Sequence, residues 1–236
     1  MKHKILLIVF SILYCESYAQ ENKTTFGLQY KPIIAVAYFD ASNNSKRNGD
    51  YLFNLKPNFS YSLGMVIRQK INHTFSIESG LNYIQRNFRL SILRDNTIYI
   101  DDFTDFKMRA YEIPVQLLAY VQTNERWYVN ASFGYSYNTL ASNIFSNGIS
   151  NQYFYQNTFR RKSSYFALLA NVGLEYRTYE KGNYYFGTSL HRPFKEIARV
   201  YPSYDQFNTG IIGENHFYLE MLGNFISIDF RYFFAK

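Results

Sequence analysis

The stretch WYVNASFGYSYNTL, residues 127–140, alternates between two kinds of side chain over its whole length. One set is apolar or aromatic and the other is small and polar: Trp127, Val129, Ala131, Phe133, Tyr135 and Tyr137 against Asn130, Ser132, Gly134, Ser136 and Asn138. Successive side chains of a β-strand point to opposite faces, so the pattern predicts a strand with one apolar face and one polar face. The rest of the chain must indicate what covers the apolar face.

The same alternation recurs in other segments. Apolar residues share one parity in 59–67, in 75–83, in 166–176 and in 226–234, with Ser, Gly, Asn and charged residues between them. The last segment breaks this parity once, because the apolar residues just before Gly223 fall on the other register. A bulge near Gly223 would restore the pattern; otherwise the part before it lies outside the bilayer.

Eight segments rich in aromatic and β-branched residues are predicted strands: 26–38, 56–68, 74–90, 107–121, 127–140, 163–178, 183–192 and 216–234. Their connections alternate between short ones and long ones, the short at 69–73, 123–126 and 180–183, the long near 39–55, 91–106, 141–162 and 193–215. Bacterial outer-membrane barrels combine an even strand number with short periplasmic turns and long extracellular loops. The sequence therefore predicts an all-β fold, an eight-stranded antiparallel up-and-down transmembrane β-barrel. Several strands should project beyond the membrane on the outer side, because they exceed the roughly 9 to 11 residues that a crossing needs.

Alternation alone also fits a soluble ligand carrier of the lipocalin kind, in which the apolar face lines a cavity. Three features favour lipid instead. The polar face consists mainly of Ser, Asn and Gly rather than of Lys and Glu. Tyr83, Trp127, Tyr176 and Tyr232, near strand ends, are typical of interfacial girdles. Aromatic residues make up 20% of the chain, far more than one ligand cavity would use.

The N-terminal residues predict export. Residues 1–19 combine two lysines, a short apolar run and a small-residue site that ends at Ala19, which is the layout of a cleaved signal peptide. We expect cleavage after Ala19, leaving residues 20–236 as the barrel domain. A lipoprotein signal at Cys15, the single cysteine, would need a small residue where Tyr14 stands. The mature chain would then contain no disulfide, and no later segment is apolar enough for a membrane-spanning helix.

The formal net charge is +7, and losing Lys2, Lys4 and Glu16 with the signal peptide would make it +6. A basic balance can indicate nucleic-acid binding. The sequence has no stretch dense in Lys and Arg, and the chain is predicted to leave the cytoplasm. We therefore expect no nucleic-acid partner.

Two prolines, Pro32 and Pro114, lie inside predicted strands. Proline cannot donate a ladder hydrogen bond, and a closed barrel has no edge where a missing donor would face solvent. Each proline is therefore predicted to mark a bulge or a locally broken ladder, and the exact register near Pro32, Pro114 and Gly223 stays open.

The segment YEIPVQL, Tyr111–Leu117, is followed by a short turn and an aromatic strand with Phe133, Gly134 and Tyr135. This combination resembles the fourth and fifth strands of the PorT-like outer-membrane β-barrel family. The signal peptide, the eight-strand layout and the aromatic C-terminal strand extend the resemblance over nearly the whole chain. It implies an integral outer-membrane protein assembled by the outer-membrane insertion machinery, and for the founding member an association with type IX secretion. The chain departs from the family pattern at its end, where Ala235 and Lys236 follow the last aromatic residue.

Charged residues on the polar faces predict a network inside the barrel. They map to the periplasmic half of the lumen, with Glu112 placed higher: Arg68, Glu78, Glu175, Arg177, Asp229 and Arg231. Charges of both signs in a narrow interior should pair, because an unpaired buried charge is costly. The alternative is a proton or ion path, but the lumen of an eight-stranded barrel is just wide enough for side chains to fill. We expect a salt-bridged plug and no open pore.

A catalytic role is the second interpretation of the polar residues. Barrels that modify lipids use a serine, a histidine and an acid near the outer rim, so Ser189, His191, Glu214 and His216 are candidates. No spacing fixes a nucleophile beside a base, and the histidines are then solvated or hydrogen-bonded. We predict no enzyme activity, no catalytic residue and no cofactor.

The loop at 95–106 holds four carboxylates, Asp95, Asp101, Asp102 and Asp105. Calcium prefers clustered carboxylates, but the ordered loop spacing with a central Gly and a closing Glu is absent. We interpret the segment as a solvated acidic loop and predict no metal site.

Aromatic residues in two other loops lie among Asn and Gln: Tyr153, Phe154, Tyr155, Tyr201, Tyr204 and Phe207. Such a mixture can bind peptides or glycans through stacking and amide hydrogen bonds, or it can extend the barrel. The expected function is a structural or interaction role, with outer-membrane lipid around the barrel and a protein partner at the extracellular loops or the periplasmic rim. The alternatives are an accessory of a secretion apparatus, a lipid-modifying enzyme and a soluble ligand carrier.

Overall fold

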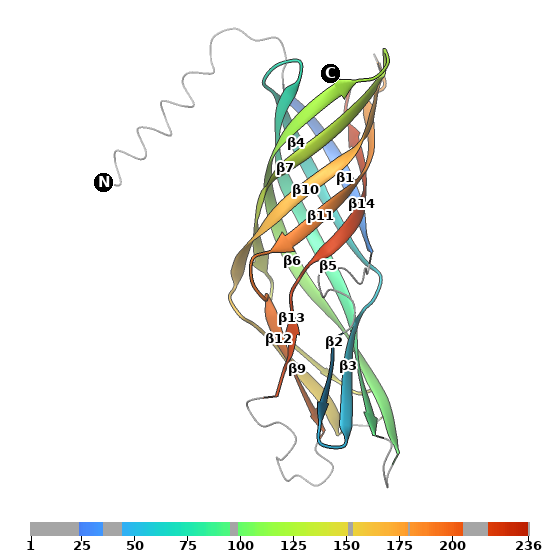
Figure 1. Cartoon of the computed structure of the whole chain (residues 1–236), viewed down its shortest axis with the longest axis vertical. Helices are drawn as coiled ribbons and strands as arrows, with labels where there is room; N and C mark the ends of the chain where they lie inside the picture. Colours follow the sequence, from blue (N-terminus) through green and yellow to red (C-terminus); the bar gives the residue numbers. More distant parts are fainter. Residues whose placement is uncertain are drawn as a thin grey trace, which may run out of the picture.

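The computed structural model describes residues 24–34, 44–94, 99–150, 153–178, 180–204 and 217–235. Every regular element in these ranges is a β-strand, and the strands follow one long molecular axis (Figure 1). They are β1 Thr24–Ile34, β2 Asn44–Asn48, β3 Tyr51–Pro57, β4 Ser60–Lys70, β5 Phe75–Arg94, β6 Ile100–Gln122, β7 Trp127–Leu140, β8 Ile144–Asn147, β9 Phe154–Arg160, β10 Ser164–Arg177, β11 Asn183–Pro193, β12 Ala198–Tyr204, β13 Leu219–Met221 and β14 Phe225–Phe233. The described residues include no helix with the length and apolarity needed to cross a membrane.

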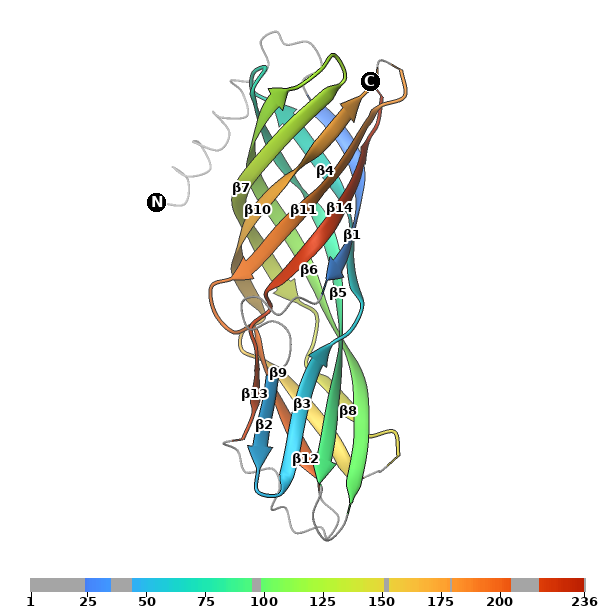
Figure 2. The ribbon, with the colours of Figure 1, turned by 45° about the vertical axis from the view of Figure 1, so that its right-hand side comes forward.

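Eight of these strands form a closed ring of antiparallel pairings. Their order is β5-β4-β1-β14-β11-β10-β7-β6, and the pairing of β6 with β5 closes the ring. The strands run obliquely around the axis in Figures 1 and 2. The opening stretch is β7, which pairs without interruption with β10 from Trp127 opposite Tyr176 to Thr139 opposite Ser164. A ring of this kind leaves no exposed sheet edge, because every strand has two neighbours.

Three short turns lie together at one end of the ring, here named the turn end, near the C-terminus in Figure 1. Their described residues are 71–74, 123–126, and 178 with 180–182, and backbone hydrogen bonds close each of them. Gly182 in the last turn has a φ of +80°, and a Cβ there would lie 2.2 Å from the Phe233 carbonyl oxygen. Both observations require glycine at this position.

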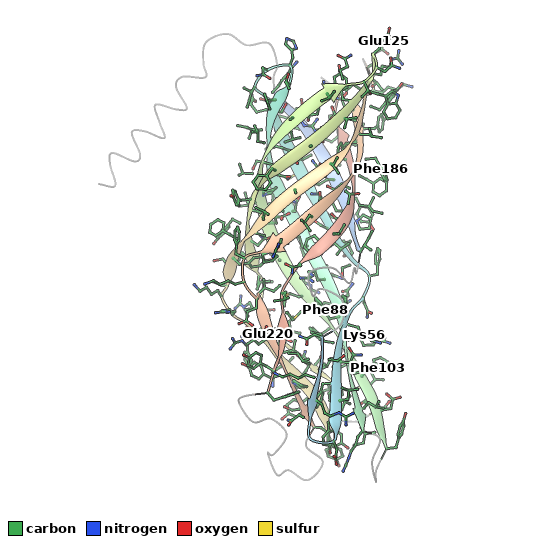
Figure 3. All side chains as sticks on the ribbon, in the orientation of Figure 1. Lys56, Phe88, Phe103, Glu125, Phe186 and Glu220 are labelled. Atoms are coloured by element: carbon green, nitrogen blue, oxygen red, sulfur yellow. The ribbon has the colours of Figure 1, made fainter. Side chains whose placement is uncertain are left out.

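The ring carries its apolar side chains outside and its polar side chains inside, as the alternation predicts. On β7 the exposed fraction of Phe133 is 53%, whereas Ser132 and Asn138 are buried in the lumen. Most positions of the other ring strands follow the same rule, and Figure 3 shows Phe186 on β11 pointing away from the ring. A small apolar cluster of Val66, Tyr185 and Phe233 is the exception and is buried inside. A ligand carrier would need an apolar lumen, and the described residues place the apolar set on the opposite side.

Both prolines interrupt a ladder without shifting its register. Between β1 and β14 the pairing stops after Tyr30 and resumes at Ile33 with an unchanged offset, and Pro32 lies in the gap. Pro114 lies in a similar gap between β6 and β5, while its pairing with β7 continues. The Ser79 hydroxyl donates a hydrogen bond of 2.8 Å to the Pro114 carbonyl oxygen across that gap. The prediction of a locally broken ladder is confirmed, and neither proline forms a bulge.

The other end of the molecule is a second β-structure, here named the extension. β5 and β6 continue into it from the ring, β2 and β3 join them, and β13-β12-β9-β8 form a separate sheet (Figure 2). Hydrogen bonds join the two halves at both edges: Asn44 Nδ2 donates to Glu220 O at 2.9 Å, and Ile149 N donates to Phe103 O at 3.0 Å. The interior is an apolar core that includes Phe53, Leu90 and Phe154 among its fully buried side chains.

The extension corrects the predicted long loops. Much of 39–55, 91–106, 141–162 and 193–215 is strand rather than loop: β2, β3, the outer parts of β5 and β6, and β8, β9 and β12. Each new strand is at most 7 residues long, and β12 finds its partner β9 only across the intervening β10 and β11. Strands this short carry a weak periodic signal.

The parity change before Gly223 has a structural cause. β13 pairs with β12 in the second sheet, whereas β14 pairs with β1 and β11 in the ring. Gly223 lies between them with a φ of +79°, a conformation that side chains other than glycine rarely adopt. The chain therefore changes sheets at Gly223, and the part before it lies outside the ring.

Candidate functional site

The lumen near the turn end holds two buried carboxylates shared between arginines. Arg68 Nη2 lies 3.0 Å from Glu78 Oε2, and Arg68 Nη1 lies 2.6 Å from Glu175 Oε2. The other oxygen of Glu175 accepts a hydrogen bond of 2.6 Å from Arg177 Nε. The guanidinium of Arg68 also lies over the ring of Phe233, 3.7 Å from its centroid. Strands β4, β5 and β10 supply these charges at positions of lumen-facing parity.

A second group of charges continues the network on β14 and β1. Arg231 forms ion pairs with Glu78 and with Asp229, the latter at 2.8 Å. Asp229 Oδ2 also lies 3.4 Å from Lys31 Nζ and accepts a hydrogen bond of 2.5 Å from Ser189 Oγ. Glu78 therefore links the two groups, because it pairs with both Arg68 and Arg231.

The structure brings together all six residues that were predicted for the periplasmic half of the lumen, and it adds Lys31. Four cations and three carboxylates take part: Lys31, Arg68, Arg177 and Arg231 with Glu78, Glu175 and Asp229. Lys31 has the lumen-facing parity of Gln29, so the alternation contained the signal that could have identified it. Removing one partner of a buried ion pair leaves an uncompensated charge, which costs about 3–5 kcal/mol. The network therefore favours a lumen closed by its own side chains.

Glu112 belongs to a separate group, farther from the turn end. Its Oε2 accepts a hydrogen bond of 2.7 Å from Asn82 Nδ2, and Asn82 in turn accepts one from Gln29. His191 Nε2 lies 3.5 Å from Glu112 Oε1, and its imidazole stacks on Phe225 with ring centroids 4.4 Å apart. The separation of Glu112 from the other predicted lumen charges agrees with its higher place in the sequence-based prediction.

Beyond Glu112 the interior becomes mainly apolar, with Arg86 as a buried charge between the rings of Phe88 and Phe225. Ile84, Ala110, Leu140 and Phe225 are buried at this level, and they belong to the same apolar cluster as the core of the extension. The lumen therefore meets a mainly apolar core at the level where it would have to open for a solute to pass. Such a core excludes water, because the interiors of proteins are close-packed.

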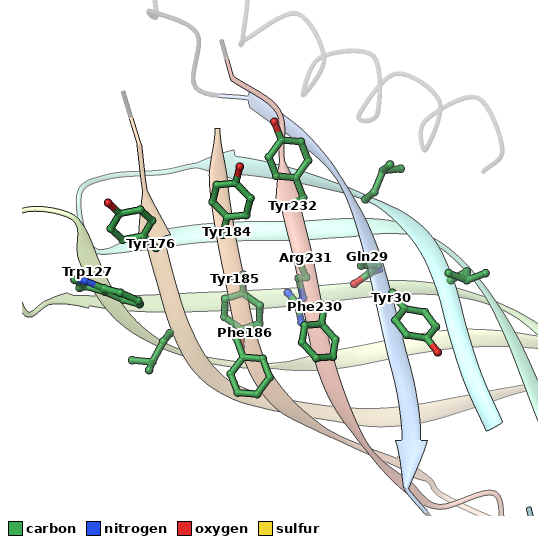
Figure 4. A pocket seen from close by; sticks show the side chains of 13 residues that line it. Gln29, Tyr30, Trp127, Tyr176, Tyr184, Tyr185, Phe186, Phe230, Arg231 and Tyr232 are labelled. Carbon is green, nitrogen blue, oxygen red and sulfur yellow. The ribbon is translucent and has the colours of Figure 1, made fainter. Parts of the chain in front are cut away.

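The outer face of the ring carries a shallow hollow of about 650 Å³ toward the turn end. Its lining is mostly apolar and aromatic, and Figure 4 shows Tyr184 and Phe186 on β11 beside Phe230 and Tyr232 on β14. Ring pairs cross between strands here, with centroids 5.2 Å apart for Tyr184 and Tyr232. An apolar surface with tyrosines near one end is typical of membrane barrels, in which aromatic residues are enriched at the membrane–water interface.

Comparison with known proteins agrees with this arrangement. The model of a family described as the outer membrane protein beta-barrel domain matches residues 5–211. The chain belongs to this family. The family and the exposed apolar band together place the protein in the outer membrane. A search of curated proteins gave no significant match.

Two solved structures are similar in overall arrangement. The outer membrane protein OprG from Pseudomonas aeruginosa is 12% identical with a TM-score of 0.49, over 90% of this chain and 95% of that one. The outer membrane protease OmpT from Escherichia coli is 10% identical with a TM-score of 0.35, over 92% of this chain and 97% of that one.

The residues considered for a lipid-modifying site do not meet in the described part of this outer-membrane barrel. Ser189 donates its hydroxyl hydrogen to Asp229, whereas His191 lies beside Glu112 and Phe225, and no hydrogen bond joins His191 to a serine. Glu214 and His216 lie outside the described residues. The prediction that the protein is not an enzyme stays a prediction.

The aromatic residues predicted for loop binding separate into two groups. Phe154 and Tyr204 are buried in the core of the extension, so their side chains are not available to a ligand. Tyr153 is exposed, and Tyr155 and Tyr201 are half-buried. Phe207 lies outside the described residues. A binding role stays a prediction for the residues that reach the surface.

The predicted acidic loop is partly strand. Asp102 is buried and accepts a hydrogen bond of 3.0 Å from Ser150 N, whereas Asp105 is exposed on the opposite face of β6. Arg89 donates two hydrogen bonds of 2.8 Å to Asp105, and this pairing lowers the pKa of the Asp105 carboxyl below its usual value. Asp95 lies outside the described residues. These carboxylates are thus engaged with different partners.

Proposed function

We propose that this protein is an eight-stranded transmembrane barrel with a closed lumen, whose function is to hold a rigid β-extension at the cell surface for binding. The barrel part rests on the closed ring of strands and on the reversal of polarity, with apolar residues outside and an ion-pair network inside. In this assignment the short turns face the periplasm and the extension faces the medium, which is the usual arrangement of such barrels.

The binding part rests on one observation, an aromatic surface on the outer face of the β13-β12-β9-β8 sheet. Phe145 and Phe159 are exposed by 60% and 49%, although they lie in regular strands of the extension. Each contacts a tyrosine of the next strand: the ring centroids are 6.0 Å apart for the tilted pair of Phe145 and Tyr155 and 5.7 Å apart for the edge-to-face pair of Phe159 and Tyr201. Exposed, ordered aromatic rings offer stacking area at a low entropic cost to sugar rings or to peptide side chains.

The closed lumen is tested by single-channel recording in planar lipid bilayers. We expect no stable conductance steps. Ion pairs fill the lumen near the turn end, and a mainly apolar core fills the region between Glu112 and the extension. Reproducible steps from the folded protein would overturn the closed-lumen proposal.

The aromatic surface is tested by photo-crosslinking on living cells. A benzophenone amino acid at Phe145 or Phe159 should capture a partner, since the group reacts with C–H bonds of peptides and glycans alike. The matched control is Lys56, an exposed position on β3 in the other half of the extension. Equal capture at Lys56, or none at either phenylalanine, would contradict a binding role for this surface.

An accessory role in protein secretion is the second candidate. The Tyr111–Leu117 segment that carries the PorT-like resemblance lies in the middle of β6, with Tyr111 and Leu117 on the lipid side. Deletion of the gene should then abolish export of cargo proteins, and intact export would remove this candidate. The Phe145 experiment is independent of it.

Outer-membrane lipid is the proposed surrounding partner, and the insertion machinery is the proposed partner during assembly. The hollow beside Tyr184, Phe186 and Tyr232 is a natural place for acyl chains, because its lining is almost entirely apolar. A soluble release of the folded protein without detergent would overturn the lipid-facing assignment.

A further inference from the structure

A small cavity of about 160 Å³ lies at the turn end of the lumen, beside the ion pairs of Arg68, Glu175 and Arg177. Its lining includes Arg68, Lys70, Ser76, Tyr120, Glu175 and Arg177. The side chains come from β4, β5, β6 and β10, which are rigid strands of the ring. The cavity is therefore built by the ring itself, and it would face the periplasm in the orientation proposed above.

The charge of this cavity is unbalanced. Its lining carries three permanent cations, Arg68, Lys70 and Arg177, and one carboxylate, Glu175. Both oxygens of that carboxylate are already engaged, one by Arg68 and the other by Arg177. Lys70 forms no ion pair with a described residue. The cavity therefore has cationic charge available and no carboxylate oxygen left to neutralise it.

Tyr120 provides an independent observation. The residue is buried, with an exposed fraction of 6%. Its hydroxyl has no hydrogen-bond partner among the described residues, although the residue lines the cavity. A buried hydroxyl without a partner costs free energy, which a ligand with an acceptor oxygen would recover. Arg177 supplies further donors, because only its Nε is used by Glu175 and its two Nη groups make no hydrogen bond to a described residue.

We infer that this cavity binds an oxyanion, a phosphate or carboxylate group, through Lys70, Tyr120 and Arg177. An oxyanion matches the site because every unused polar group named here is a donor. Hydrogen bonds between ionised partners are shorter and stronger than neutral ones, and a guanidinium can engage two oxygens at once. A volume of about 160 Å³ admits one such group rather than a whole solute.

The first test uses inorganic phosphate and isothermal titration calorimetry on the folded protein in a maltoside detergent, with chloride at equal ionic strength as the reference. We expect saturable binding of phosphate. Lys70→Gln and Arg177→Gln should each weaken it about tenfold, because each removes a charge-assisted hydrogen bond. Lys181→Gln is the matched control, since Lys181 is an exposed lysine of a neighbouring turn outside the cavity.

Tyr120→Phe is the variant that separates binding from folding. Its hydroxyl has no partner in the free protein, so its removal should leave the unfolding midpoint unchanged or raised while phosphate binding weakens severalfold. Absence of saturable binding to the wild-type protein would overturn the inference. An equal loss in Lys181→Gln would overturn it as well, because the effect would then be one of general surface charge.

The source of the oxyanion is distinguished in lipid nanodiscs. If discs of phosphatidylglycerol abolish phosphate binding and discs of phosphatidylcholine preserve it, an anionic headgroup occupies the site. If both discs preserve it, the ligand is a soluble oxyanion. Both results support the site, and binding that is lost in both kinds of disc would show that the detergent created it and would overturn the inference.

Discussion

The ring buries polar and charged side chains, whereas the extension buries apolar ones, although β5 and β6 run through both regions. Along β5, the buried residues share one parity from end to end: Glu78 and Asn82 in the ring, Leu90 and Ile92 in the extension. The outward parity changes in the opposite sense, from apolar Leu81 in the ring to charged and polar side chains beyond it. The two regions thus share geometry and differ in what surrounds them.

The difference shows that strand parity and residue type carry separate information. Parity decides which face is inside, because side chains alternate along a strand. Residue type then reports the solvent on the outside, hydrocarbon for the ring and water for the extension. The change along β5 lies near Arg86, which is buried between the aromatic rings of Phe88 and Phe225. In the orientation proposed above, the outer boundary of the membrane would lie at this level.

The largest expected effect in the ring comes from Arg231→Met. It leaves Glu78 and Asp229 with one cation fewer in a buried site, so the ring should lose about 3–5 kcal/mol of unfolding free energy. Urea unfolding in lipid vesicles measures this through the fluorescence of Trp127, the single tryptophan, which lies in the ring. Arg89→Met removes an exposed arginine of the extension and should leave the same transition unchanged. Similar losses in both variants would contradict the distinction between the regions.

Next in size is Leu90→Ala in the core of the extension. Truncating a fully buried leucine costs about 2–5 kcal/mol, because a cavity remains. A reporter in the extension, the double variant Trp127→Phe and Phe217→Trp, should show this loss, whereas Trp127 fluorescence in the ring should not. If Trp127 reports the full loss, ring and extension unfold as one unit.

A lysine on the outer face of the ring should cost more unfolding free energy than a lysine on the outer face of the extension, and this difference is the next in size. Phe133→Lys places a charge near the middle of the lipid-facing side of β7, at a cost of about 2–4 kcal/mol in vesicles. Phe145→Lys places the same charge on the outer face of the extension, where a surface substitution changes stability by about 0.5 kcal/mol or less. The two vesicle measurements compare the surroundings directly, and equal costs would show that both faces meet the same solvent.

Within the lumen, the hydrogen bonds of a polar side chain should decide whether its replacement by an apolar one raises or lowers the unfolding free energy. Asn130 is buried and neither of its side-chain polar atoms has a partner, so Asn130→Leu should raise the unfolding free energy by about 1 kcal/mol. Asn138 lies on the same face of β7 and donates a hydrogen bond of 2.8 Å to Ser136 Oγ, so Asn138→Leu should lower it. Urea midpoints of the two variants that move in the same direction would contradict this reason.

The smallest expected effect is a pH dependence of the extension. Hydrogen bonds from Arg89 lower the pKa of Asp105 from its ordinary value of 3.8. A lowered folded-state pKa contributes stability that is present above the ordinary pKa and is lost as the pH falls through the lowered one. Both side chains are exposed, so the contribution is small. Between pH 7 and pH 3 the reporter double variant should show a larger midpoint decrease when it carries Asp105 than when it also carries Asp105→Asn. Parallel decreases would exclude this pair as a cause.

Much of the ring was predictable because its rules are local. The alternation in 127–140 identified both faces of β7, and the short turns fixed the order of neighbouring strands. The charges of Arg68, Glu78 and Asp229 were predicted inside the lumen, and they are. Their partners were not predictable, because Arg68 and Glu175 are 107 residues apart in sequence and meet only when the ring closes.

The extension was less predictable for the same reason. Its strands β8, β9 and β12 are short, and β12 pairs with β9 across the whole hairpin of β10 and β11. Phe154 was therefore predicted to lie in a loop, although its side chain is fully buried in the core of the extension. Composition cannot separate an aromatic side chain that packs in a core from one that faces a partner.

The sequence by itself determined the class of this protein, a β-barrel of the outer membrane, because alternation with a period of two is a property of neighbouring residues. It also determined which faces meet lipid. Only the tertiary structure decided which charges pair and where the lumen is closed. It also decided that the segments predicted as loops form the strands of the extension. Those features depend on contacts between strands far apart in the chain, and such contacts form only when the ring closes and sets the register of every strand.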